Sequence, residues 1–187
     1  MSDANFKRFL FSNLLRGLAG FALIILIVVF FRKYAPSGVE EYIEPFTSRP
    51  LLMFAIFMAS ETFIGIIPPE FFIIWALDNP VILFLAFIIL LSILSFFGAL
   101  LNYGVGRIIN KNIYFQKFAR KTMEKYAPYY YKWGGWVIVI ASFTPVPYAT
   151  ISLVSGTLNY PVKKFLLYAS SRFLRFGIYA WIIFNTL

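Results

Sequence analysis

Four charged side chains lie in stretches of the chain that are otherwise apolar. Glu61 and Glu70 are nine residues apart, and Arg172 and Arg175 are three residues apart, so on a helix the two arginines share a face. Ionisable groups at membrane depth are costly and usually face a partner or a watery cavity. Burial favours the neutral form of a carboxyl group, so either glutamate could carry protons. We therefore take these four residues as candidates for substrate binding or proton coupling.

The two arginines have more than one candidate partner. Planar guanidinium groups suit both phosphate and carboxylate, so Arg172 and Arg175 could bind the two glutamates or the headgroup of an anionic substrate. The sequence does not separate these alternatives, and both can hold at different steps of a cycle. In a third interpretation, a glutamate and an arginine pair only to hold the fold together.

Prolines interrupt two long apolar stretches, the first of which holds both glutamates. The stretches are residues 51–77 and 133–158. Proline removes a helix hydrogen bond and clashes with the preceding turn, so neither stretch can form one straight helix. Paired broken segments in two halves of a membrane protein point to a transport site. The tips of the two predicted hairpins comprise Pro68, Pro69, Thr144, Pro145, Pro147 and Tyr148.

The composition excludes several classes of protein. Hydrophobic residues make up 60% of the chain and charged residues 13%, which excludes an ordinary soluble domain. There are no cysteines and no histidines, so we expect no disulfide, no metal site and no cofactor. The net charge of +9 indicates loops that lie against anionic lipid headgroups rather than a nucleic-acid partner. Signatures of catalysis, such as a Gly-rich phosphate loop, are missing, so we expect no enzyme.

The distribution of lysine and arginine predicts the topology. Residues 107–132 carry seven basic residues and one acid, which is typical of a cytoplasmic loop. The chain has five apolar segments, at 17–31, 51–77, 81–106, 133–158 and 165–187. If all five crossed the membrane from a cytoplasmic N-terminus, this loop would lie outside. If the two proline-broken segments instead return to the side from which they entered, the loop lies inside. The charge distribution therefore favours two re-entrant segments.

The predicted fold is an all-α integral membrane protein with an N-terminal anchor helix and two inverted repeats. Each repeat is a proline-broken re-entrant hairpin followed by a transmembrane helix. Residues 1–50 hold a cytoplasmic segment, the anchor helix at 17–31 and an external loop. The membrane domain at 51–187 comprises a re-entrant hairpin at 51–77, a transmembrane helix at 81–106, the basic loop at 107–132, a re-entrant hairpin at 133–158 and a transmembrane helix at 165–187. Gly106 permits close helix packing, and Arg107 marks the inner interface.

The order of these motifs resembles that of the DedA superfamily, also called the SNARE-associated Golgi or VTT-domain family. The resemblance covers roughly residues 45–185 and rests on Glu61 with Pro68-Pro69-Glu70, on Tyr103-Gly-Val-Gly-Arg107, on Phe143-Thr-Pro-Val-Pro-Tyr148 and on Ser155-Gly156. The second of the hairpins looks like that of the YqaA-type branch. Ser142 and Tyr148 stand where the typical hairpin has arginines, and we suggest that Arg172 and Arg175 supply the positive charge instead.

The resemblance implies an integral inner-membrane protein that moves lipids or lipid-linked phosphates between leaflets, with coupling to protons as an option. We therefore expect scrambling or flipping of an anionic phospholipid or a polyprenyl phosphate, with membrane lipids as partners. One alternative is a proton- or cation-coupled transporter of a small solute, in which Glu61 is the coupling site. Another is a membrane scaffold that transports nothing and whose polar groups only pair with one another.

Overall fold

The computed structural model describes residues 44–63, 67–111, 132–144 and 148–186, together with isolated positions in 15–30 and 124–130. These parts are helices joined by short turns, and they contain no strand, as the all-α prediction requires. Most of the predicted anchor helix at 17–31, most of the basic loop and the tip residues Pro145 and Pro147 lie outside the described residues.

The first apolar stretch forms two helices that are separated at its prolines. Helix α3 runs over Pro50–Phe63 and α4 over Pro69–Leu77. Pro68 is extended, with φ −59° and ψ 136°, and Pro69 occupies the first position of α4, where its missing N–H costs no hydrogen bond. Before this turn, the backbone N–H of Ile67 donates to the hydroxyl of Ser60 at 2.9 Å. A side chain of α3 thus holds the segment that leads into α4.

The second apolar stretch is divided in the same way. Helix α7 runs over Trp136–Phe143 and α8 over Tyr148–Thr157. Thr144 ends α7 in an extended conformation, with φ −118° and ψ 162°, as expected for a residue before proline. Both stretches are therefore broken at their prolines, whereas their placement as re-entrant hairpins in a membrane stays a prediction.

Helix α5, Val81–Lys111, is the central element of the fold. Its 31 residues extend about 46 Å, so it is longer than the predicted helix at 81–106. Among the described residues, α5 alone is both long and apolar enough to cross a membrane. It packs most extensively against α8 and also contacts α3, α4 and α10.

The segment predicted as one helix at 165–187 consists of two helices. Helix α9 runs over Val162–Ala169 and α10 over Ser171–Thr186, with a turn at Ser170 between them. The hydroxyl of Ser170 donates to the carbonyl of Leu167 at 2.6 Å, a local bond that competes with the regular helix pattern. The turn matters for the site because it sets the start of α10 just before Arg172.

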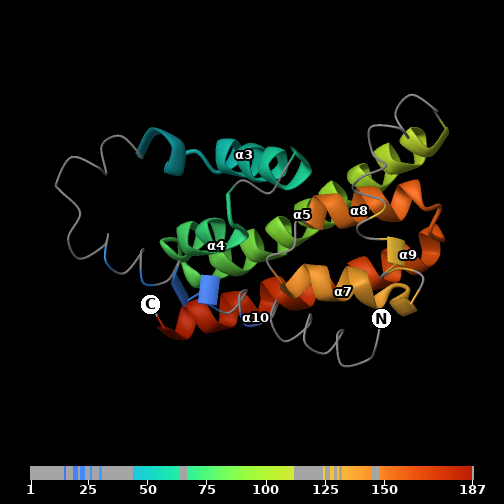
Figure 1. Cartoon of the computed structure of the whole chain (residues 1–187). Helices are drawn as coiled ribbons and strands as arrows, with labels where there is room; N and C mark the ends of the chain where they lie inside the picture. Colours follow the sequence, from blue (N-terminus) through green and yellow to red (C-terminus); the bar gives the residue numbers. More distant parts are fainter. Residues whose placement is uncertain are drawn as a thin grey trace.

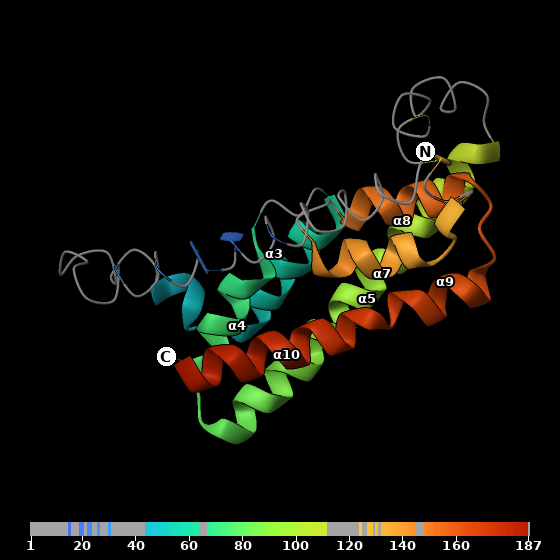
Figure 2. The same cartoon turned by 60° about the horizontal axis from the view of Figure 1, so that its bottom comes forward.

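The two broken pairs open toward opposite ends of α5 (Figures 1 and 2). The outer ends of α3 and α4 lie near the beginning of α5, and those of α7 and α8 lie near its end, while both breaks lie near its middle. This is the arrangement that two inverted hairpins would have. The inverted repeat itself stays a prediction.

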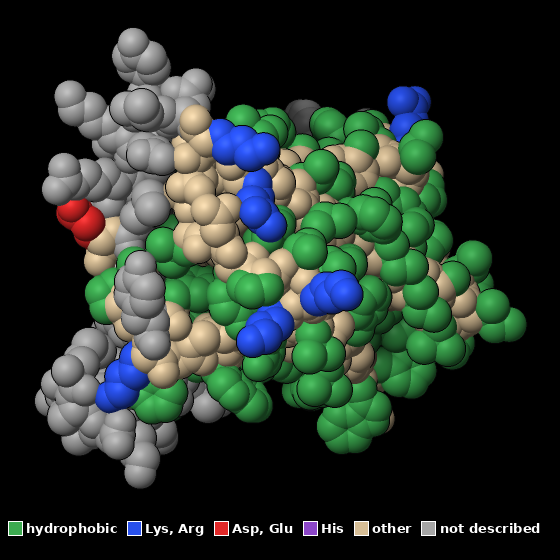
Figure 3. Space-filling view, turned by 90° about the vertical axis from the view of Figure 1, so that its right-hand side faces the viewer, with side chains coloured by type: hydrophobic (Ala, Val, Ile, Leu, Met, Phe, Trp, Pro, Cys, Tyr) green, Lys and Arg blue, Asp and Glu red, His purple; other side chains and the backbone are tan. Residues whose placement is uncertain are grey.

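Basic side chains gather at the end of the molecule where α5 ends (Figure 3). The end of α5 contributes Arg107 and Lys111, and the first turn of α9 contributes Lys163 and Lys164. Arg107 is held in place, because its Nε donates to the hydroxyl of Tyr103 and its Nη1 to Oδ1 of Asn159, both at 3.1 Å. By the positive-inside rule, this end is predicted to face the cytoplasm.

Helices α5 and α8 touch through their backbones at two glycines. A Cβ atom on Gly106 would collide with the carbonyl of Leu153 on α8, and one on Gly156 would collide with the carbonyl of Tyr103 on α5. Backbone atoms cannot yield as a flexible side chain can. The close packing expected at Gly106 is therefore present, and Gly156 is its partner across the interface.

Replacing Gly106 with alanine should destabilise the protein by about 1–3 kcal/mol, the usual cost of overpacking. Gly104 on the same helix is a matched control, because nothing lies within 4 Å of a Cβ added there. Gly104→Ala should leave stability unchanged or raise it slightly through better helix propensity. Thermal unfolding of both variants in detergent measures the difference, and equal stabilities would contradict the close contact.

The charge-based topology predicts opposite sides for the two ends of α5. The chain has no cysteine, so Asn79→Cys and Lys111→Cys each introduce a single reactive thiol. In sealed vesicles, a membrane-impermeant maleimide should label only one of the two variants, and after the membrane is made permeable it should label both. Labelling of both variants in sealed vesicles would show that the ends lie on the same side.

Candidate functional site

A cluster of buried polar side chains lies where two apolar cores meet. One core is formed by α3, α4, α10 and the first part of α5, and the other by α7, α8, α9 and the last part of α5. Along α5, the first core ends at Leu91 and the second begins at Ala99. Ser92 and Ser95 lie between these positions, and both are buried. The polar cluster is built around Ser95.

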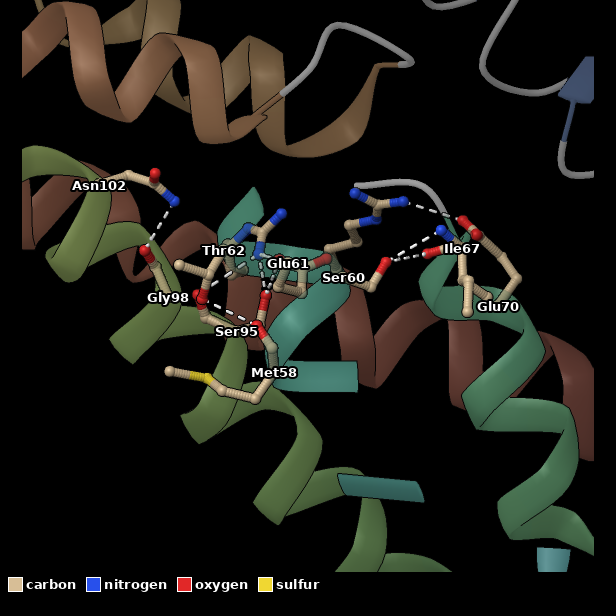
Figure 4. A network of polar contacts seen from close by, with 11 residues as sticks. Met58, Ser60, Glu61, Thr62, Ile67, Glu70, Ser95, Gly98 and Asn102 are labelled. Atoms are coloured by element: carbon tan, nitrogen blue, oxygen red, sulfur yellow. Dashed lines mark hydrogen bonds and ion pairs between the residues drawn. The ribbon is translucent and has the colours of Figure 1, made fainter. Parts of the chain in front are cut away.

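Glu61 and Arg172 form an ion pair at Ser95. Glu61 comes from the last turn of α3 and Arg172 from the first turn of α10. The Ser95 hydroxyl donates to Oε2 of Glu61 at 2.8 Å, and Nη1 of Arg172 donates to both the carboxylate and the hydroxyl. Glu61 is 8% exposed and Arg172 2%. Three helices thus meet at one buried charge pair, with Glu61 and Ser95 facing each other in Figure 4.

A second ion pair lies one turn further along α10. Nη2 of Arg175 donates to Oε1 of Glu70 at 2.9 Å. Glu70 is in the first turn of α4, where a negative charge is favoured by the helix dipole. The guanidinium of Arg175 also lies over the ring of Tyr179, 5.0 Å from its centre. In this structure, each arginine therefore binds one of the two glutamates.

Arg172 also contacts the second broken pair through Tyr148. Its guanidinium carbon lies 3.9 Å from the ring centre of Tyr148, the first residue of α8, which is the geometry of a cation–π interaction. Three buried atoms in the described part of the chain, the hydroxyls of Tyr148 and Ser152 and Nε of Arg172, make no hydrogen bond of regular geometry, although the two hydroxyls lie close to each other. Each such atom costs about 1–3 kcal/mol in a protein interior.

The structure brings together five of the residues that the sequence singled out: Glu61, Glu70, Tyr148, Arg172 and Arg175. Pro68 and Pro69 form the first break beside them. Thr144 does not join the cluster through its hydroxyl, which donates to the carbonyl of Ile140 within α7 at 2.9 Å. Gly106, Arg107 and Gly156 lie apart, at the basic end of the molecule. No group of acids suited to a metal ion is found among the described residues.

Sequence reasoning missed Ser95 and Ser152. Both are fully buried, Ser95 in the apolar helix α5 and Ser152 in α8. Ser92 and Ser95 are three residues apart and share a face of α5, which is a signal that the sequence did contain. Ser142 was considered only as a replacement for an arginine, and its hydroxyl contacts that of Ser171 at 2.9 Å.

Most of the chain matches the model of one known protein family. The family model described as the VTT domain matches residues 48–184, which is nearly three quarters of the chain. The chain belongs to the VTT-domain family. This is the DedA/SNARE-associated Golgi family, whose members are generally membrane proteins, so the resemblance expected from the motifs is confirmed. Assignment to the YqaA-type branch stays a prediction.

A curated relative is similar to part of this chain. The protein of Methanocaldococcus jannaschii described as "Uncharacterized protein MJ0201" is 30% identical over 83 residues. The match covers 44% of this chain and 52% of the relative, so the chain spans about half the length of that protein. No solved structure matches the chain.

Breaking the Glu61–Arg172 pair from one side should be costly. Glu61→Gln or Arg172→Gln leaves one buried charge without its partner, which costs about 3–5 kcal/mol. The double variant removes both charges and should recover much of that loss. Thermal unfolding and folded yield of the two single variants and the double variant measure the coupling between the residues. Additive losses in the double variant would mean that the two side chains do not interact.

Proposed function

We propose that this VTT-domain protein moves an anionic lipid, either an anionic phospholipid or a polyprenyl phosphate, between the leaflets of a membrane. The observation that carries the proposal is the buried Glu61–Arg172 pair beside the breaks of both helix pairs. Buried charges are a poor way to stabilise a fold, since well-packed apolar residues often do as well or better. Charged residues inside a membrane domain therefore support a role in function.

The arginines offer a way to exchange partners during transport. A phosphate presents the same planar pair of acceptor oxygens to a guanidinium as a carboxylate does. In the proposed cycle, Glu61 and Glu70 occupy Arg172 and Arg175 when no substrate is present, and the phosphate of the headgroup takes their place in part when it arrives. The apolar side chains exposed on α5 and α10, such as Phe97 and Trp181, provide a surface for the acyl chains.

The second candidate function is transport of a small solute coupled to protons or cations. It is favoured by the position of Glu61, whose carboxylate joins α3 to α5 and α10 through Ser95 and Arg172. A proton on this carboxylate would weaken the contact and release α3 from its neighbours. The scaffold alternative is supported by the same pairs, because each glutamate already satisfies one arginine.

The proposal includes a location and an orientation. The VTT-domain family is membrane-associated, and α5 is apolar enough to cross a membrane. We place the protein in the inner membrane of the cell with its N-terminus and the basic end of α5 in the cytoplasm. Membrane lipids are then its immediate partners, and its action is transport rather than catalysis.

Leaflet exchange in proteoliposomes tests the proposal. Labelled phosphatidylglycerol and a polyprenyl phosphate should exchange faster than in empty liposomes, and phosphatidylcholine should exchange more slowly than either. Arg172→Lys and Arg175→Lys should each slow exchange of the anionic lipids by about tenfold or more, because lysine cannot bind a phosphate through two parallel hydrogen bonds.

The control for these variants is Arg107→Lys, since Arg107 lies at the basic end and contacts neither ion pair. It should exchange lipid at the wild-type rate. Exchange of every lipid at the rate of empty liposomes would remove the proposed function. Solute uptake that follows a pH gradient and is lost in Glu61→Gln would support the second candidate in its place.

A further inference from the structure

We propose that Tyr148, Ser152 and Arg172 form a binding site for a phosphate oxygen at the N-terminus of α8. The inference deepens the proposed function and rests on it for the choice of ligand, because it names the groups that would hold the headgroup. Tyr148 and Ser152 belong to the second broken helix pair and Arg172 to α10, and all three are distinct from the carboxylates that Arg172 and Arg175 bind. Binding at the site can be measured without any transport.

The first argument is that three polar atoms are buried here without regular hydrogen bonds. Tyr148 is 7% exposed, Ser152 is 0% and Arg172 is 2%. Nε of Arg172 makes no hydrogen bond within the described part of the chain, and the two hydroxyls, which lie close to each other, make none of regular geometry. Native proteins rarely leave such groups unsatisfied, and an unplaced water or ligand is the usual explanation.

The second argument is that Tyr148 links Ser152 on α8 to Arg172 on α10. Tyr148 and Ser152 are one helical turn apart on α8, so their side chains lie on the same face. The ring of Tyr148 packs against the guanidinium of Arg172 at 3.9 Å. The face of α8 that carries both hydroxyls is therefore turned toward the arginine on α10.

The third argument concerns the kind of atom that these three groups would bind. Nε of arginine can only donate a hydrogen bond, and both hydroxyls are able to donate, so each of the three groups can bind an acceptor. The backbone N–H groups in the first turn of α8, which begins at Tyr148, have no partner within the helix and add a positive field at that end of the helix. An oxygen of a phosphate has the lone pairs and the negative charge that this arrangement favours.

The planar guanidinium of Arg172 allows the carboxylate of Glu61 and a phosphate oxygen to be bound at the same time. Nη1 of Arg172 faces Glu61 and Ser95, and in the planar group the Nε–H bond points away from Nη1. A phosphate oxygen on the Nε side would therefore not need to displace Glu61 at once. The site is suited to receive a headgroup before the ion pair opens.

Ligand affinity in detergent solution tests the site. The probes are inorganic phosphate, dihexanoyl phosphatidic acid and dihexanoyl glycerol, the last of which has the same chains without phosphate. Wild-type protein should bind the phosphatidic acid and not the glycerol lipid, as measured by the shift in thermal unfolding. Tyr148→Phe and Ser152→Ala should each weaken that affinity by about tenfold. Binding of inorganic phosphate with the same dependence would identify free phosphate as a ligand of the site.

The stability of the ligand-free variants distinguishes a ligand-binding site from a site that holds a structural water. If the Tyr148 hydroxyl has no partner without ligand, Tyr148→Phe should leave the ligand-free midpoint unchanged or higher. Tyr168→Phe is the matched control: Tyr168 packs against Trp136, outside the site, so its loss should not alter affinity. A lower ligand-free midpoint in Tyr148→Phe with unchanged affinity would assign the hydroxyl to a buried water and overturn the inference.

Two further outcomes are decisive. Wild-type protein that binds no phosphate-bearing probe would also overturn the inference. Binding that depends on Tyr148 in a protein that exchanges no lipid in proteoliposomes would keep the site and remove the proposed lipid translocation. The two proposals can therefore fail separately.

Discussion

The ion pair between Glu61 and Arg172 is the interaction on which the middle of this protein depends. Neither charge can stay buried alone, because an unpaired charge in an apolar interior is far more costly than a paired one. The pair therefore requires α3 and α10 to meet at Ser95 of α5. The two apolar cores are separated at this same point on α5, so the pair also determines where they can join.

The contacts between helices near the end of α5 differ in kind from those near its middle. Toward its end, the backbone contact with α8 at Gly106 and Gly156 leaves no room for sliding. Toward its middle, α3 and α4 are tied to α10 through charged side chains, whose partners can be exchanged. The α5–α8 contact is therefore made by backbone atoms, whereas α10 is held to α3 and α4 by charged side chains.

The sequence predicts the local features of this site because their causes are local. The loss of a backbone donor at Pro68 and Pro69 breaks a helix in any environment, and the i, i+3 spacing of Arg172 and Arg175 places them on one face of α10. The partner of Arg172 is 111 residues away in sequence, so the pairing depends on packing that no local pattern contains. Ser95 was missed for a related reason, since most serines in apolar helices bond to their own backbone, as Ser92 does to Ile89.

The shortness of the broken helices bears on how the protein would experience a membrane potential. Helices α4, α7 and α8 have 9, 8 and 10 residues, so each extends only about 12–15 Å, roughly half of the ~30 Å hydrocarbon core. If water enters beside the short helices from both faces in the predicted membrane placement, the insulating layer is thinnest around Glu61 and Arg172. A membrane potential of 100 mV changes the free energy of one elementary charge that crosses the membrane by about 2.3 kcal/mol. Most of that drop would fall across these few residues, so movement of net charge past them would be driven by voltage.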